Sequence, residues 1–389
     1  MGGGRLIERE ALISELRATG LRERGGAGLL VAERWQALRD APGEQRYAVC
    51  NAVDGAPHVP TARFLLGSDP EAVIEGLLIA AQAIGATRGV VGVNAGHSEE
   101  TARLERAIEQ VGRRWRLEAG EAGTALPCDL TILELPGSLV SAEETAIIRA
   151  LESRQPLPYL RDDGDVRGVH GAPTLVETAE TLAAVAAVFR EGAAAPEVST
   201  VVMTVSGDVS RQRTFRVSLG ATVASVLEQA EGADLGELRI KAVQLGGPTG
   251  RFVAGDCLDK PIAFGGPEQP DSARDRGDIA GGIEVFGGGR CAVEMARDAI
   301  AYLHEESCGK CVFCREGTRQ ALDILNDIVE CRAEAEQVEL LVELGEAMKT
   351  GSICTLGRRA FIPVSSAMAV FAEDFKSHLD GKCCSGQTA

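Results

Sequence analysis

The stretch ESCGKCVFCREGTRQ, residues 306–320, carries three cysteines at two-residue intervals ahead of a basic segment. Three thiolates spaced C-x2-C-x2-C can serve one metal centre, but a closed four-ligand site needs one more ligand. The downstream segment GSICTLGRRAFIP offers Cys354. Two helical patterns, at residues 318–330 and 334–349, lie between, and an up-and-down helix pair returns the chain to its starting end. We therefore predict a helical C-terminal region with one four-cysteine centre, made of Cys308, Cys311, Cys314 and Cys354.

The spacing of these cysteines favours a [4Fe–4S] cluster. In a cubane each thiolate caps one iron, which suits a tight triplet plus one distant ligand. Zinc is the alternative; it also takes four cysteines, but usually as two separated pairs. Of the remaining cysteines in this region, Cys331 is expected to be a buried helical thiol, and Cys383 and Cys384 to be solvated in a polar tail.

Composition limits the classes of protein to consider. With 389 residues, 45% hydrophobic and 25% charged, the chain is expected to be a soluble globular protein of more than one domain. A net charge of −17 argues against nucleic acid or an anionic membrane as the main partner. The N-terminus lacks a signal-peptide core, and the longest apolar run, residues 77–86, is too short for membrane insertion. A cytoplasmic location with reduced or metal-bound thiols is therefore expected.

The first half of the chain alternates strand and helix patterns, which predicts an α/β layer with ligands at the strand ends. Strands are expected at residues 46–51, 89–94 and 129–135, and helices at residues 5–19, 70–84 and 98–112.

The second half changes character after residue 195. Residues 183–195 are rich in alanine and run into Pro196, which indicates a linker. Strand patterns at 201–207, 214–219 and 240–247, with a helix at 222–232, suit a ubiquitin-like β-grasp module. The predicted domains are thus an α/β domain at 1–195, a β-grasp domain at 196–275 and a helical domain at 276–389.

Taken together, ESCGKCVFCREGTR and GSICTLGRRA resemble the cluster-binding domain of the flavoprotein, NADH-binding subunit of respiratory complex I. The same subunit type occurs in NAD-linked hydrogenases and formate dehydrogenases. The resemblance covers nearly the whole chain. It implies an FMN domain, a soluble-ligand-binding β-grasp domain and a helical [4Fe–4S] domain, in that order. It also implies NADH as the substrate, a thioredoxin-like [2Fe–2S] ferredoxin-type partner subunit and a larger oxidoreductase complex. The flavin does the chemistry, so no catalytic side chain is expected.

Within the flavin domain the resemblance can be followed by motif. GLRERGGAGLLVAERW (20–35) resembles the family's glycine-rich FMN loop, whose backbone N–H groups cradle a phosphate, and its arginine stands where the family usually has lysine. NAVDGAP (51–57) and GSLVSAEETAI (137–147) resemble the next two elements. The cofactor-binding residues implied are Gly25, Gly26, Gly28, Arg34, Asn51, Asp54, Glu143 and Glu144. Asn51 could instead be a turn former, and the glutamate pair could simply open a helix.

Other positions depart from the family pattern. Val53 and Ala56 replace carboxylates, Leu139 and Ala142 replace a tyrosine and a glycine, Glu177 and Thr178 replace an Asn–Asn pair, and Leu29 and Ala37 replace phenylalanines that stack on adenine. Two functions follow. The first is a subunit that oxidises NADH, or reduces NAD, through FMN and a [4Fe–4S] cluster. The second is an electron-relay or assembly subunit that keeps the cluster but has lost efficient NADH binding.

Overall fold

The computed structural model describes residues 9–25, 28–119, 126–162, 164–232, 239–259, 261–262 and 281–382. The chain forms two compact units. The first contains Met1–Val202 and Thr214–Leu219, and the second contains Met203–Arg213, Gly220–Glu268 and Gly277–Ala389, as far as these are described. Among the described residues, no helix is both long and apolar enough to cross a membrane.

The first unit is built on a parallel sheet of four strands in the order β3-β2-β1-β4. These strands are β1 (Tyr47–Ala52), β2 (Arg88–Asn94), β3 (Asp129–Leu135) and β4 (Thr174–Thr178). From β1 the chain builds outward through β2 and β3, and β4 is then added on the opposite side of β1. The strand order therefore reverses between β1 and β4, and open α/β sheets bind ligands at the carboxyl ends of the strands at such a switch point.

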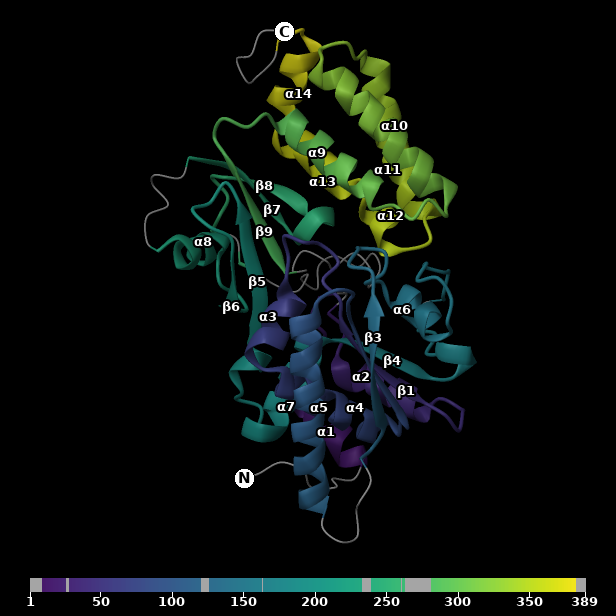
Figure 1. Ribbon diagram of the computed structural model, residues 1–389. Helices are drawn as coiled ribbons and strands as arrows, with labels where there is room; N and C mark the ends of the chain where they lie inside the picture. Colours follow the sequence, from purple (N-terminus) through teal and green to yellow (C-terminus); the bar gives the residue numbers. More distant parts are fainter. Residues whose placement is uncertain are drawn as a thin grey trace. The chain divides into compact units, whose positions relative to one another are not determined.

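Both faces of this sheet are covered, and the strand residues alternate between two cores. Cys50 of β1 belongs to one core and Val49 to the other. The first core packs against α1 (Arg9–Thr19), α2 (Val31–Asp40), α3 (Thr61–Ser68), α4 (Pro70–Ile84), α5 (Ser98–Ala119) and α7 (Ala179–Glu191). The second core packs against α6 (Glu144–Leu151), which Figure 1 shows apart from α1, α4, α5 and α7. The α/β layer expected from the sequence is confirmed.

The linker predicted at residues 183–195 is wrong. Helix α7 continues to Glu191, and its residues from Ala179 to Val188 are buried. Small side chains here permit close packing against α4: a Cβ on Gly76 would lie 1.9 Å from the carbonyl oxygen of Leu182. The alanine-rich composition thus reflects a tight helix–helix contact instead of a flexible connection.

A second sheet has five strands in the order β6-β5-β9-β7-β8. Its strands are β5 (Thr200–Gly207), β6 (Arg213–Ser218), β7 (Ile240–Leu245), β8 (Arg251–Ala254) and β9 (Gly282–Gly287). Helix α8 (Val223–Glu231) begins at Thr222, whose side chain accepts from Ser225 N, and ends at Gly232 with a φ of +87°. The strands and helix expected in this region are present, and β8 and β9 are additional.

The C-terminal region is helical, as predicted. It consists of α9 (Ala292–Glu305), α10 (Val312–Val329), α11 (Ala335–Gly351), α12 (Thr355–Arg359), α13 (Ile362–Val370) and α14 (Ala372–Leu379). Within the second unit, these helices pack on strands β7 and β8. Ser366 Oγ accepts from Phe252 N at 2.9 Å, and Lys241 forms an ion pair with Asp374.

Candidate functional site

The glycine-rich loop follows α1 and is folded back on itself. Gly25 and Gly28 have φ angles of +76° and +64°, which favour glycine, while Gly26 lies outside the described residues. Glu23 N donates to Leu29 O at 2.9 Å, which holds the two arms of the loop together. The predicted loop is therefore present, and its backbone conformation suits close approach to a phosphate.

This loop lies beside the carboxyl end of β4 and the start of α7. Thr178 caps α7 by accepting from Thr181 N, and its hydroxyl donates to Arg24 O at 3.1 Å. In return, Arg24 N donates to Thr181 Oγ1 at 2.9 Å. The glycine loop is thus fixed next to a helix N-terminus at the switch point, and helix N-termini in general favour anionic groups. Thr178, a departure from the family pattern, helps to hold the loop in position.

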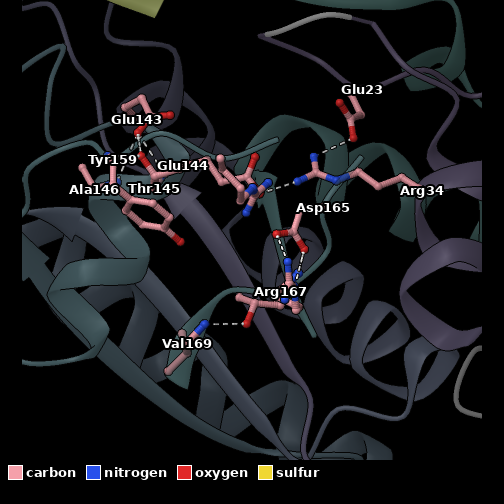
Figure 2. Close-up of polar contacts among 12 residues, drawn as sticks. Glu23, Arg34, Glu143, Glu144, Thr145, Ala146, Tyr159, Asp165, Arg167 and Val169 are labelled. Carbon is pink, nitrogen blue, oxygen red and sulfur yellow. Dashed lines mark hydrogen bonds and ion pairs between the residues drawn. The ribbon is translucent and has the colours of Figure 1, made fainter. Parts of the chain in front are cut away.

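Arg34 is held between two carboxylates (Figure 2). Its guanidinium lies 2.7 Å from Glu23 Oε1 and 2.8 Å from Glu144 Oε1, and Arg161 also contacts Glu144 Oε1 at 2.8 Å. Burial alone would lower the pKa of Arg34, but the surrounding carboxylates raise it above its usual range. Burial would raise the pKa of Glu144, but Arg34 and Arg161 bring it below its usual value. Arg34 and Glu144 therefore both stay charged.

Glu143 and Glu144 have different roles. Glu143 caps α6, because its Oε2 accepts from Thr145 N at 2.9 Å and Ala146 N at 3.2 Å, as Figure 2 shows. Burial raises the pKa of Glu143. The helix-opening alternative therefore describes Glu143, whereas Glu144 points its carboxylate at Arg34. Asn51, at the end of β1, donates from Nδ2 to Ala142 O at 2.8 Å and so ties β1 to the segment before α6.

Asp54 also has a local structural role. Its carboxylate accepts from Ala62 N at 2.8 Å and Arg63 N at 2.9 Å, at the start of α3. Burial raises the pKa of Asp54 to about 6. Nearby, Val53 and Ala56 are buried, so the positions that carry carboxylates in the family pattern are part of an apolar interior here.

Sequence reasoning missed three residues of this site. Glu23 and Arg161 complete the ion-pair network around Arg34, and the indole of Trp35 donates to Glu177 Oε1 at 3.1 Å. Glu23 precedes the glycines and could have been noticed as a charged residue inside a phosphate loop. Arg161 lies in an irregular segment without periodicity, so no local pattern indicated it.

The four predicted cluster cysteines gather at the ends of the C-terminal helices. Cys308 lies in the segment before α10, and Cys311 occupies the N-cap position of α10. Cys314 lies in the first turn of α10, and Cys354 occupies the N-cap position of α12. Burial, together with the neighbouring thiols of Cys311, Cys354 and Cys308, raises the pKa of Cys314 to about 12. The helix pair therefore returns the chain as the sequence predicted.

Local contacts support this arrangement. Ser307 Oγ lies 3.3 Å from Cys314 Sγ, and Thr318 Oγ1 donates to Cys314 O at 2.8 Å. Gly357 leaves no room for a side chain, since a Cβ there would lie 2.5 Å from Ser352 Oγ and 2.9 Å from Cys314 Cβ. In the described part of the chain, no three His, Cys, Asp or Glu side chains are drawn together closely enough to hold a single metal ion. A [4Fe–4S] cluster needs one thiol per iron, and the four thiols formed by Cys314 and its three neighbours fit that group.

The predictions for the other cysteines are confirmed in part. Cys50 and Cys128 are buried core thiols, as expected. The prediction of a helical thiol at Cys331 is wrong, because this residue follows α10 with a φ of +56° and is only partly buried. Its conformation reverses the chain between α10 and α11. The expectation for Cys383 and Cys384 concerns residues outside the described ranges.

Comparison with known proteins agrees with both halves of this site. Residues 16–187 match the Nuo51 FMN-binding domain, and residues 294–378 match the NADH-ubiquinone oxidoreductase-F iron–sulfur binding region. The chain is 30% identical over 381 residues to the HndC component of the NADP-reducing hydrogenase of Solidesulfovibrio fructosivorans, covering 96% of this chain and 77% of that protein. It is 29% identical over 401 residues to the F 2 component of the NADH-quinone oxidoreductase of Rhizobium meliloti, covering 98% and 94% respectively.

Among solved structures, an NAD+-reducing [NiFe]-hydrogenase in the H2-reduced state superposes with a TM-score of 0.83 at 30% identity. The match covers 96% of this chain and 63% of the hydrogenase chain, so this chain spans less than two thirds of that polypeptide. The chain belongs to the family of FMN-binding, iron–sulfur subunits that includes the F component of NADH-quinone oxidoreductase and its counterparts in NAD(P)-linked hydrogenases.

Proposed function

We propose that this protein is the electron-input subunit of a larger oxidoreductase, in which NADH is oxidised, or NAD reduced, through FMN and electrons pass to a [4Fe–4S] cluster. The observation that carries the proposal is the glycine loop at the β1/β4 switch point, in the same chain as a four-cysteine helical region. The two segments match an FMN-binding domain and an iron–sulfur binding region. The alternative of an electron-relay or assembly subunit has less support, because the full-length relatives are named as oxidoreductase and hydrogenase subunits.

When bound, FMN supplies two-electron exchange with a nicotinamide and one-electron exchange with a cluster. We propose that the backbone of Gly25, Gly26 and Gly28 and the N-terminus of α7 bind its phosphate. Thr178 and Arg24 keep that loop in place through the contacts described above. Since the cofactor carries the chemistry, these residues bind and orient it, and no side chain has to act as a nucleophile or base.

The charged residues are proposed to shape the rest of the site. Arg34 and Glu144, joined by an ion pair, would border the flavin, and Asn51 and Asp54 would fix the backbone after β1. Glu143 supports this arrangement by capping α6. Because both carboxylate partners neutralise Arg34, its charge is available to a phosphate only in part.

The cluster is proposed to be held by Cys308, Cys311, Cys314 and Cys354, which requires reduced thiols and hence a reducing, cytoplasmic environment. Basic residues follow the ligands closely. Arg315 donates to Gly309 O at 2.8 Å, and Arg358 donates to Ser352 O at 2.9 Å. Such cations reduce the cost of gathering several thiolates.

The three-module organisation remains part of the proposal. We propose that a soluble-ligand-binding β-grasp module separates the flavin and helical modules and extends to β9, since β9 lies between β5 and β7 in its sheet. The cluster also needs an acceptor. A thioredoxin-like [2Fe–2S] subunit is the proposed partner, because this chain offers one predicted cluster site and the related proteins are subunits of complexes.

Anaerobic purification under mild conditions tests this function. The protein should contain about four irons and four sulfides per chain, bind FMN, and be recovered with an iron–sulfur partner. Stoichiometric zinc without labile sulfide would refute the cluster assignment. A monomer that reduces soluble acceptors as fast as any reconstituted complex would refute the partner.

A further inference from the structure

Glu177 is a buried carboxyl group at the proposed flavin site. It lies near the carboxyl end of β4, opposite Cys50 of β1, and its relative exposure is 2%. Among the described residues its one side-chain hydrogen bond comes from the indole of Trp35, at 3.1 Å. An indole N–H is neutral, so it does not compensate a full negative charge in this interior.

The charges around Glu177 are already paired with one another. Arg34 joins Glu23 to Glu144, and Arg161 also binds Glu144. Three carboxylates, those of Glu23, Glu144 and Glu177, thus share two guanidinium groups. One negative charge is left over, and of these three carboxyl groups only that of Glu177 forms no ion pair with a described residue. A buried, unpaired carboxylate is costly, so the neutral acid is the favoured form.

The titratable groups that face Glu177 also favour its neutral form. Burial, together with the carboxylates of Glu23 and Glu144, raises the pKa of Glu177 to about 8, although Arg34 and the Trp35 hydrogen bond offset part of the rise. Cys50 lies across the strand pair, and burial together with Glu177 raises its pKa above the usual range. The thiol is therefore neutral and supplies no charge.

We propose that FMN binding to this site is coupled to proton uptake by Glu177, so that the neutral acid is the form that accepts the cofactor. The reasoning is electrostatic: the FMN phosphate brings negative charge to a loop that already includes Glu23, and an ionised Glu177 would add to the repulsion. The proton comes from solvent, and no bond other than the carboxyl O–H is made or broken. The proposal rests on the proposed FMN binding.

The first test follows the proton without flavin. The chain has two tryptophans, so Trp115→Phe leaves Trp35 as the only indole reporter. Fluorescence of flavin-free protein, titrated from pH 5 to pH 10, should change with a midpoint near the pKa of Glu177, about 8. Glu177→Gln keeps an acceptor for the Trp35 N–H and should abolish the transition, and Glu23→Gln should move the midpoint down. The same transition in Glu177→Gln would show that Glu177 is not the titrating group.

The second test measures the dissociation constant of FMN by quenching of flavin fluorescence at pH 7 and pH 9. One proton taken up at a pKa of about 8 predicts about tenfold weaker binding at pH 9 in the parent protein. In Glu177→Gln the dissociation constants of FMN at pH 7 and pH 9 should differ by less than about twofold. If FMN binding depends equally on pH in the parent and in Glu177→Gln, the proton coupling is refuted, whereas the proposed FMN binding is not. If FMN binds at no pH while the Trp35 titration is intact, the proposed flavin function fails as well.

Discussion

Replacing Glu177 with glutamine should change how the stability of the first unit depends on pH. A native pKa of about 8, raised by burial, compares with about 4.3 for an unfolded glutamate. The native state then holds a proton that the unfolded state has lost. This contribution to stability is full below pH 4 and disappears as pH rises through 8.

The magnitude follows from linkage. Between pH 5.5 and pH 8.5, one group with these two pKa values lowers the free energy of unfolding by about 3 kcal/mol. Glu177→Gln cannot ionise, so its free energy of unfolding should fall by about 3 kcal/mol less over the same range. Glu180 is a second buried acid, and burial raises its pKa to about 7. Because of Glu180, the free energy of unfolding of the Glu177→Gln variant should still fall to some extent as pH rises.

Urea unfolding followed by tryptophan fluorescence is the suitable assay, because Trp35 and Trp115 both lie in the first unit and report on it alone. Glu105→Gln, an exposed change on α5, is the matched control and should preserve the parent profile. Parallel pH profiles for the parent and Glu177→Gln would refute the reasoning that Glu177 is protonated in the folded protein.

Three further outcomes are expected. Cys354→Ser should lower iron and sulfide content strongly while Cys331→Ser leaves it unchanged, and equal losses would contradict the ligand assignment. Gly357→Ala should reduce cluster occupancy, because the added Cβ would lie 2.5 Å from Ser352 Oγ and 2.9 Å from the Cβ of the ligand Cys314. Gly289→Ala, with nothing within 4 Å of the added Cβ, should not reduce it. Iron analysis distinguishes the two variants, and normal occupancy in Gly357→Ala would show that the site relaxes freely. Leu29→Phe should tighten NADH binding about two- to tenfold by restoring a stacking face, measured as the NADH dependence of flavin reduction, and no gain would mean that the exposed loop does not contact adenine.

Strong local signals made part of the fold predictable. The helix at residues 70–84 has an Asp69 side chain that accepts from Ala72 N, a proline in its first turn and Gly85 at its end with a φ of +74°. Those capping residues are adjacent in sequence, so the pattern fixed both helix ends. At residues 183–195 the prediction of a linker was wrong, because alanine content alone does not distinguish a linker from a tightly packed helix such as α7.

The candidate site was predictable where it depends on neighbours in the chain. The glycine loop and the cysteine triplet are local motifs, and the structure has both. The pairing of Arg34 with Glu144 joins residues 110 positions apart, and Arg161 enters from an irregular segment. Such partners depend on how the sheet edge and α6 come together, which no single segment of sequence encodes.

The most direct measurement of the central claim is an anaerobic NADH titration of protein that has been shown to contain both FMN and the cluster, followed by flavin absorbance. We expect NADH to bleach the flavin, with an apparent affinity weakened by the loss of the stacking aromatics and carboxylates. Flavin that dithionite bleaches but saturating NADH does not would contradict the assignment of this chain as an NADH-linked electron-input subunit.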